Sequence, residues 1–168
     1  MDLHAHFNNI QTVITADLNQ ARWKKNAMST YDTDFYQWTQ QQAELLRQGA
    51  LSALDVEHLI EEIETMGRSQ RDATGSHLVI VMMHLLKWKY QPERRGSSWY
   101  DSIVNGRIQI DDLLENNPSL KSQLKNLIDK AYPKAKRYAS QQTKLPLITF
   151  PEQCPFTAEQ IISDWWPD

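Results

Sequence analysis

The sequence has one cysteine, Cys154, among its 168 residues. A lone cysteine excludes an internal disulfide framework and a zinc site built from several cysteines, and it fits a reducing compartment. Glycine is also scarce, with five residues, and no window alternates apolar and polar residues for long. These shortages argue against β-sheets and favour helices.

The chain also lacks a long apolar run and a strong net charge. Its longest apolar run, at 78–83, is far shorter than the roughly 18–20 residues that cross a bilayer. Residues 1–20 contain no basic start followed by an apolar block, so we expect no signal peptide. A net charge of −3 gives no whole-protein reason to bind nucleic acid or an anionic membrane. We therefore predict a soluble, cytoplasmic protein that does not bind membranes.

Length and periodicity predict the fold class. A chain of this length is the usual size of one domain. We predict an all-α fold, a compact helical bundle of five to six helices around a central apolar helix at about 69–90. A proline-rich extended strap at 144–156 and a short C-terminal helix should follow. We assign 31–168 to this single domain and 1–30 to an N-terminal extension that is weakly ordered or a loosely packed helix.

The extension is polar and carries one weak pattern. Its apolar residues have the spacing of a helical stripe: Ile10, Val13, Ile14, Leu18 and Ala21. The polar remainder is typical of a segment that frays or packs loosely. Met28, followed by Ser29 and Thr30, would also suit the start of a shorter product.

Capping residues and helix breakers predict the first helices. Asp32 and Thr33 are capping types, so a first helix should begin just after them, and Gly49 should stop it. Asp55 should cap a second helix that ends at Gly67. The apolar stripe of this second helix has 3.6-residue spacing: Val56, Leu59, Ile60, Ile63 and Met66.

Prolines organise the second half of the chain. Pro92 should end the central helix, and a further helix is expected over 98–114. Asn117 and Pro118 predict the start of the next helix, which Pro133 should kink or divide.

The last part of the chain is predicted as strap and short helix. Leu147, Ile148 and Phe150 should anchor the strap on the bundle. Thr157 and Gln160 have capping-box spacing, which indicates the start of the short last helix.

Several segments, in collinear order, resemble one known family. They are YDTDFYQW (31–38), LIEEIETMGRSQR (59–71), HLLKWKYQP (84–92), RRGSSW (94–99), NPSLK (117–121), FPEQCPFTAEQI (150–161) and the aromatic end at 165–166. The chain from Tyr31 onward resembles the bacterial family catalogued as domain of unknown function twenty-nine, common in cyanobacteria. The resemblance implies a small, soluble, all-helical domain, and it supplies no catalytic residues.

The first candidate site combines carboxylates and histidines. Glu61 and Glu64 continue a row that begins at Glu57, and His77 and His84 lie on one line of the central helix. The two histidines rise about 10.5 Å apart, too far to share one metal ion, so we predict no metal and no cofactor. Two interpretations remain. His84 is a core residue bonded to a glutamate, or Glu61, Glu64 and His84 provide acid–base chemistry in a cleft between the two predicted helices.

The second candidate site would bind an anion through Arg68, Arg94 and Arg95. Arginines near aromatic residues can hold phosphate and stack on bases. A simpler interpretation is that the basic residues neutralise acidic residues elsewhere in the same fold. Residues 76–107 carry five basic and two acidic groups (net +3), whereas residues 31–75 carry three basic and nine acidic groups (net −6).

Neither candidate forms a diagnostic catalytic motif. Six tryptophans in a chain of amphipathic helices favour a partner surface, for which Trp165 and Trp166 are candidates. The leading prediction is a non-enzymatic protein-interaction or adaptor domain that binds an unknown protein partner or another copy of itself. The alternative is a small enzyme or an anion- or metal-binding protein that uses the cleft, and the third hypothesis is a nucleic-acid-binding module.

Overall fold

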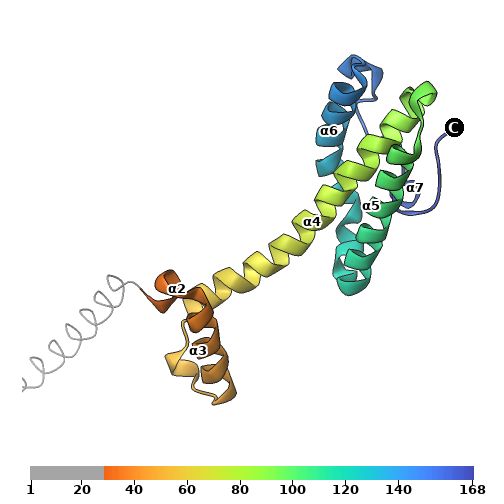
Figure 1. Cartoon of the computed structure of the whole chain (residues 1–168). Coiled ribbons are helices and arrows are strands. Elements are labelled where there is room, and N and C mark those ends of the chain that lie inside the picture. Colours follow the sequence, from red (N-terminus) through yellow and green to blue (C-terminus); the bar gives the residue numbers. More distant parts are fainter. Residues whose placement is uncertain (1–28) are drawn as a thin grey trace, which may run out of the picture. The chain divides into compact units, whose positions relative to one another are not determined.

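The computed structural model describes residues 29–168, and every regular element in this range is helical (Figure 1). The predicted all-α bundle is therefore confirmed. None of the helices described is long and apolar enough to span a membrane. The α-helices are α2 (Thr30–Thr33), α3 (Phe35–Arg47), α4 (Val56–Tyr90), α5 (Ser97–Asn116), α6 (Leu124–Thr143) and α7 (Ala158–Ile162).

Four short 3-10 helices join these elements, and one of them corrects a prediction. Pro118 begins the 3-10 helix η3, so α6 starts only at Leu124, and α6 then continues through Pro133 without division. The chain therefore uses tighter turns where the sequence predicted the first turns of an α-helix. The four are η1 (Leu51–Ala53), η2 (Pro92–Arg94), η3 (Pro118–Gln123) and η4 (Leu147–Thr149).

The chain divides into two compact units. The first ends at Glu62, and the second runs from Ile63 to Asp168. Helix α4 begins in the first unit and continues through the second. One domain over 31–168 stays a prediction, and nearly all of the predicted extension, 1–30, lies outside the described residues.

Helix α4 is a single helix of 35 residues, so the predicted break at Gly67 is wrong. The central helix expected at about 69–90 is the second part of this longer helix. A glycine inside a helix lowers the stability of the helix by only about 1 kcal/mol relative to alanine. The helical hydrogen bonds on both sides of Gly67 can offset this cost. A glycine that ends a helix usually adopts a left-handed backbone. Among the glycines described, only Gly49 does so, with φ of 69°.

The hydrophobic core belongs to the second unit. There α5 and α6 lie alongside the second half of α4 (Figure 1), and α4 is apolar almost all round, as predicted. Helix α5 comes close to α4 at Gly106, where an added Cβ would lie 2.6 Å from Cγ2 of Val81. The side chains of α4 that are completely buried include Leu78, Val81, Met82, Leu85 and Leu86.

The strap is held differently from the prediction. Phe150 is buried as expected, but Leu147 and Ile148 are exposed, Ile148 by 92%. Both lie in η4, a single turn that buries neither of them. The hydroxyl of Tyr132 on α6 donates to the carbonyl of Pro151 at 2.7 Å. Polar and aromatic anchors therefore hold the strap where aliphatic ones were expected.

The chain end is tied to α5 by one buried cation. Arg107 donates to the carbonyls of Gln160 and Ile161, both at 2.9 Å, and to that of Trp165 at 2.6 Å. Thr157 and Gln160 form the predicted capping box at the start of α7. The C-terminal segment is thus part of the second unit's fold.

Candidate functional site

The structure does not assemble the predicted carboxylate–histidine site. Because the two predicted helices are one helix, the cleft between them does not exist. Glu64 and His84 lie twenty residues apart along α4, which is about 30 Å of helix. Glu61 and Glu64 are exposed, and Glu64 pairs with Arg68 at 3.1 Å. The acid–base alternative therefore has no geometric basis.

His84 is a core histidine, although its partner is not a glutamate. Its Nδ1 donates to the carbonyl of Ile80, one turn earlier in α4, at 3.0 Å. Burial lowers its pKa below the ordinary histidine value, and nearby Lys87 adds to this effect. At neutral pH the imidazole is therefore uncharged, and its Nδ1 is hydrogen-bonded within its own helix.

The three predicted anion-binding arginines have separate roles. Arg68 bonds to Glu64 and Thr65 on its own helix. The Nε of Arg95 donates to the carbonyl of Trp88 at 2.9 Å, and its guanidinium lies 5.4 Å from the centre of the Trp88 ring. Arg94 is exposed in η2. Nucleic-acid binding through these residues stays a prediction.

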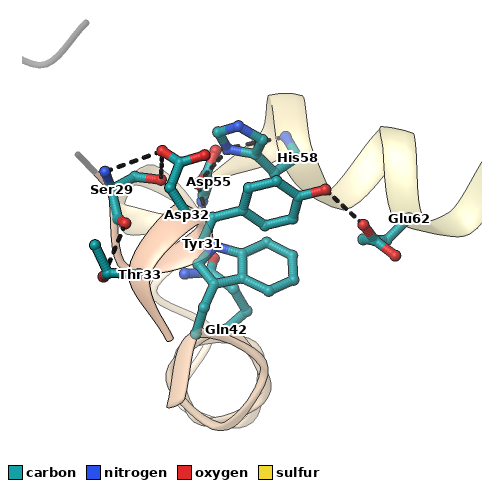
Figure 2. A network of polar contacts seen from close by, with 9 residues as sticks. Ser29, Tyr31, Asp32, Thr33, Gln42, Asp55, His58 and Glu62 are labelled. Carbon is teal, nitrogen blue, oxygen red and sulfur yellow. Dashed lines mark hydrogen bonds and ion pairs between the residues drawn. The ribbon is translucent and has the colours of Figure 1, made fainter. Parts of the chain in front are cut away.

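The structure does bring together a polar network in the first unit, around Asp55 (Figure 2). Oδ2 of Asp55 accepts from Nδ1 of His58 at 2.7 Å and from the indole N–H of Trp38 at 3.1 Å. The backbone N–H of Asp55 donates to the side chain of Gln42 at 2.8 Å. Asp55 thus caps α4, as predicted, and also joins α3 to α4.

The ionisation of this network follows from its contacts. Burial raises the pKa of Asp55, but the hydrogen bonds from His58, Trp38 and the backbone outweigh it and leave the pKa lowered. The hydrogen bond to Asp55 raises the pKa of His58, against a smaller opposing effect of burial. The pair therefore favours a charged carboxylate beside a protonated imidazole.

Tyr31 completes the network at the start of the described chain. Its ring stacks on the imidazole of His58, and its hydroxyl donates to Glu62 at 2.6 Å (Figure 2). This hydrogen bond raises the pKa of Tyr31 to about 12. The carboxylate of Asp55 is hydrogen-bonded to His58 and Trp38, and the rings of Tyr31 and His58 stack on each other. These groups therefore have a structural role, and we call the network the clasp.

The stack of Tyr31 on His58 was not predicted from the sequence. A usable signal was the spacing of Asp55 and His58, three residues apart at a helix start, which places both side chains on one turn. The stacking partner Tyr31, 27 positions earlier, has no such local signal. In residues 29–168 no group of three or more histidine, cysteine or acidic side chains is placed to hold a metal ion.

Cys154 borders a cleft of the second unit. This cleft has a volume of about 650 Å³ and lies between α6 and the strap. Burial raises the pKa of the Cys154 thiol, which donates to the carbonyl of Phe156 at 3.5 Å. A protonated, engaged thiol is a poor nucleophile. Cys154 therefore does not supply a nucleophile to this cleft.

A groove between α4 and α6 is lined by basic residues whose grouping was not predicted from the sequence. Its volume is about 360 Å³, and Arg71, Lys130 and Lys134 line it. Arg71 is already paired with Asp72 at 3.3 Å, and both lysines are exposed to solvent. The basic side chains of this groove are therefore not arranged around a specific ligand.

The most distinctive surface is an apolar ridge on α4, formed by Val56, Ile60, Ile63 and Met66. Each of these side chains is between 53% and 68% exposed. At about 100° per residue they project from one side of the helix. All four belong to the apolar stripe that the 3.6-residue spacing predicted for this helix.

The same side of α4 is fully buried farther along the helix. Continuing at about 100° per residue, it passes through four side chains with no exposed surface. These are Thr74, Leu78, Val81 and Leu85, which the second unit encloses. One continuous stripe is therefore covered in its second half and uncovered in its first half among the residues described.

These features define an all-α protein with an exposed apolar helix face beside a polar clasp. The family model for a domain of unknown function, DUF29, matches residues 30–166. The chain belongs to this family, which confirms the resemblance noted in the sequence. Comparisons with curated proteins and with solved structures found no match.

Proposed function

We propose that this protein is a protein-interaction domain whose binding face is the ridge of α4. The contrast along one helix carries the proposal. The side of α4 that is fully buried at Leu78 and Val81 is more than half exposed at Ile60 and Ile63. Exposed, aligned apolar side chains commonly mark a partner surface. An amphipathic helix laid on such a face is a recurring mode of recognition.

The free energy gained by covering the ridge is large enough for the centre of an interface. Covering the exposed parts of Val56, Ile60, Ile63 and Met66 would contribute roughly 4–7 kcal/mol, in proportion to their exposure. Association itself costs about 4–15 kcal/mol, because the two molecules lose translational and rotational freedom. The ridge therefore suits a partner that is pre-ordered, or one that adds contacts beyond it.

The charges around the ridge define the partner's chemistry. Residues 55–64 contain five acidic side chains and no lysine or arginine. A helix that carries basic residues beside its apolar stripe complements this surface and should associate faster at low salt. The first unit also exposes the apolar side chains of Phe35, Tyr36, Leu46 and Leu51.

Site-specific photo-crosslinking tests the proposal. A photoreactive phenylalanine derivative is placed at position 63 in the full chain, which is irradiated in host cells. Because Ile63 lies in the ridge, we expect an adduct heavier than one chain. The matched control places the same probe at Thr65, which is also exposed but lies on nearly the opposite side of α4.

Two substitutions distinguish binding from random collision. Ile60→Glu puts a charge into the ridge and should abolish the heavier adduct at position 63, whereas Glu61→Gln on the other side should leave it unchanged. Equal adducts from positions 63 and 65 would refute the ridge as a binding face. So would the absence of any adduct at position 63.

A further inference from the structure

We propose that residues 10–21 of this same chain cover the ridge of α4, so that a partner must displace them to bind. The inference rests on the proposed function of the ridge and adds its regulation. Residues 10–21 lie outside the described residues, and the proposal uses their sequence, their tether and their charge.

The apolar pattern of the segment matches the ridge in length. Its apolar residues run from Ile10 to Ala21, which is about 16 Å if they follow a helix. The ridge runs from Val56 to Met66, about 15 Å of α4. Ile14 and Ile63 stand near the middles of the two stripes. Two apolar stripes of equal length can cover each other end to end.

Residues 22–28 connect the segment to the described chain and are long enough for it to reach the ridge. Tyr31 stacks on His58 and bonds to Glu62, so the chain before Ser29 starts beside the first two turns of α4. Residues 22–28 can span about 23–25 Å when extended, which exceeds the length of the ridge. A linker of this length gives an effective concentration on the order of millimolar.

Charge complementarity favours the same occupant. Arg22, Lys24 and Lys25 follow the segment's apolar stripe, and Asp17 is the one charged residue within residues 10–21, so residues 10–28 carry a net charge of +2. The start of α4 carries the five acidic side chains of residues 55–64. A basic stretch tethered beside an acidic helix start is attracted to it, most strongly at low salt.

Size argues against a second copy as the resting occupant. A stable dimer interface takes about 20–30 residues from each partner. The ridge offers four side chains. A tethered segment needs less area, because the tether already holds it at a high effective concentration near the ridge. Residues 10–21 therefore fit the ridge better than an untethered copy does.

Engineered cysteines test the cover in the full chain. In a Cys154→Ala background, Ile14→Cys is combined with Ile63→Cys, and the control pairs Ile14→Cys with Thr65→Cys. Positions 63 and 65 share the same tether but face nearly opposite ways. We expect the 14–63 disulfide to form within one chain at least about tenfold faster than the 14–65 disulfide. Trypsin should release it as residues 1–22 linked to residues 48–68.

A second measurement uses the photoreactive probe at position 63 and leaves the cysteine in place. Ile14→Glu with Leu18→Glu should abolish the adduct within one chain and increase the heavier adduct several-fold. The matched control, Thr12→Glu with Asn19→Glu, adds the same charge on the other side of the predicted stripe and should change neither.

The outcomes separate the two proposals. Equal rates for the 14–63 and 14–65 disulfides would overturn the cover. A disulfide between two chains through position 63 would also overturn it and identify a second copy as the occupant. In either case a heavier adduct at position 63 would leave the interaction face standing. No adduct of any kind there would refute the interaction face itself.

Discussion

The ring of Tyr31 stacks on the imidazole of His58, with ring centroids 4.0 Å apart and an angle of 21° between the planes. The hydroxyl of Tyr31 reaches Glu62 on the next turn of α4. His58 is itself held by Asp55, the cap of the helix. The start of the described chain is therefore fixed to α4, directly beside the ridge.

The ionisation of His58 gives a first prediction. Its folded pKa is raised by the hydrogen bond to Asp55, so its contribution to stability is fully present below the ordinary histidine pKa of about 6.5. This contribution is lost as the pH rises through the folded value. We expect the Cε1–H resonance of His58 in NMR spectra to titrate above pH 6.5 and to move to lower pH in Asp55→Asn. A midpoint at or below the ordinary value would contradict the pairing.

His84 should respond to pH in the opposite direction. Burial lowers its folded pKa, so the folded state disfavours the protonated ring, and stability is lost as the pH falls below the unfolded value of about 6.5. Urea unfolding of the wild type and of His84→Gln should show a smaller loss of stability between pH 7.5 and 5.5 in the variant. The prediction fails if both proteins lose stability equally.

Two glycines should respond oppositely to the same substitution. Gly106→Ala places a Cβ 2.6 Å from Val81 and should destabilise the protein by about 1–3 kcal/mol, because α5 and α4 must move apart. A Cβ at Gly75, also in a helix, meets nothing within 4 Å. Gly75→Ala should therefore stabilise by up to about 1 kcal/mol. Thermal and denaturant unfolding measure both changes, and effects of the same sign would refute this packing.

Arg107 should be essential for holding the chain end. Arg107→Ala leaves the carbonyls of Gln160, Ile161 and Trp165 without their buried donor, at about 1–3 kcal/mol for each group left unsatisfied. Arg107→Lys keeps the charge but cannot reproduce the planar set of donors, so its loss should be intermediate. Denaturant unfolding measures the loss, and limited proteolysis should cut the last residues earlier in Arg107→Ala. Wild-type stability in that variant would show that the contacts are dispensable.

Local chemistry allowed much of the fold to be predicted. The end of α3 was predicted correctly from Gly49, which has a left-handed backbone. Its start was predicted less exactly, because Asp32 and Thr33 lie in α2 and the capping side chain is that of Asp34, which accepts from the backbone of Gln37. Thr157 and Gln160 opened α7 as expected. Such signals act within one turn, so they can be recognised without knowing the neighbours.

The candidate sites were harder to predict because they depend on contacts between distant residues. The grouping of Glu61, Glu64 and His84 required two helices to face each other, but they lie on one continuous helix. The clasp of Tyr31 and His58 joins residues 27 positions apart through a stack of rings. No spacing rule predicts such a pair.

Composition, spacing and motifs were enough to predict that the chain is all-α, that it resembles its family and that an apolar stripe runs along the start of α4. Which part of the apolar side of α4 is covered depends on the packing of other elements against it, which the sequence does not show. Ile63 and Val81 are both apolar and lie on the same side of one helix, yet Ile63 is exposed and Val81 is completely buried. Periodicity reports which side of a helix is apolar, whereas burial requires another element against that side. The close approach of Gly106 supplies that element at Val81, and no described element buries Ile63.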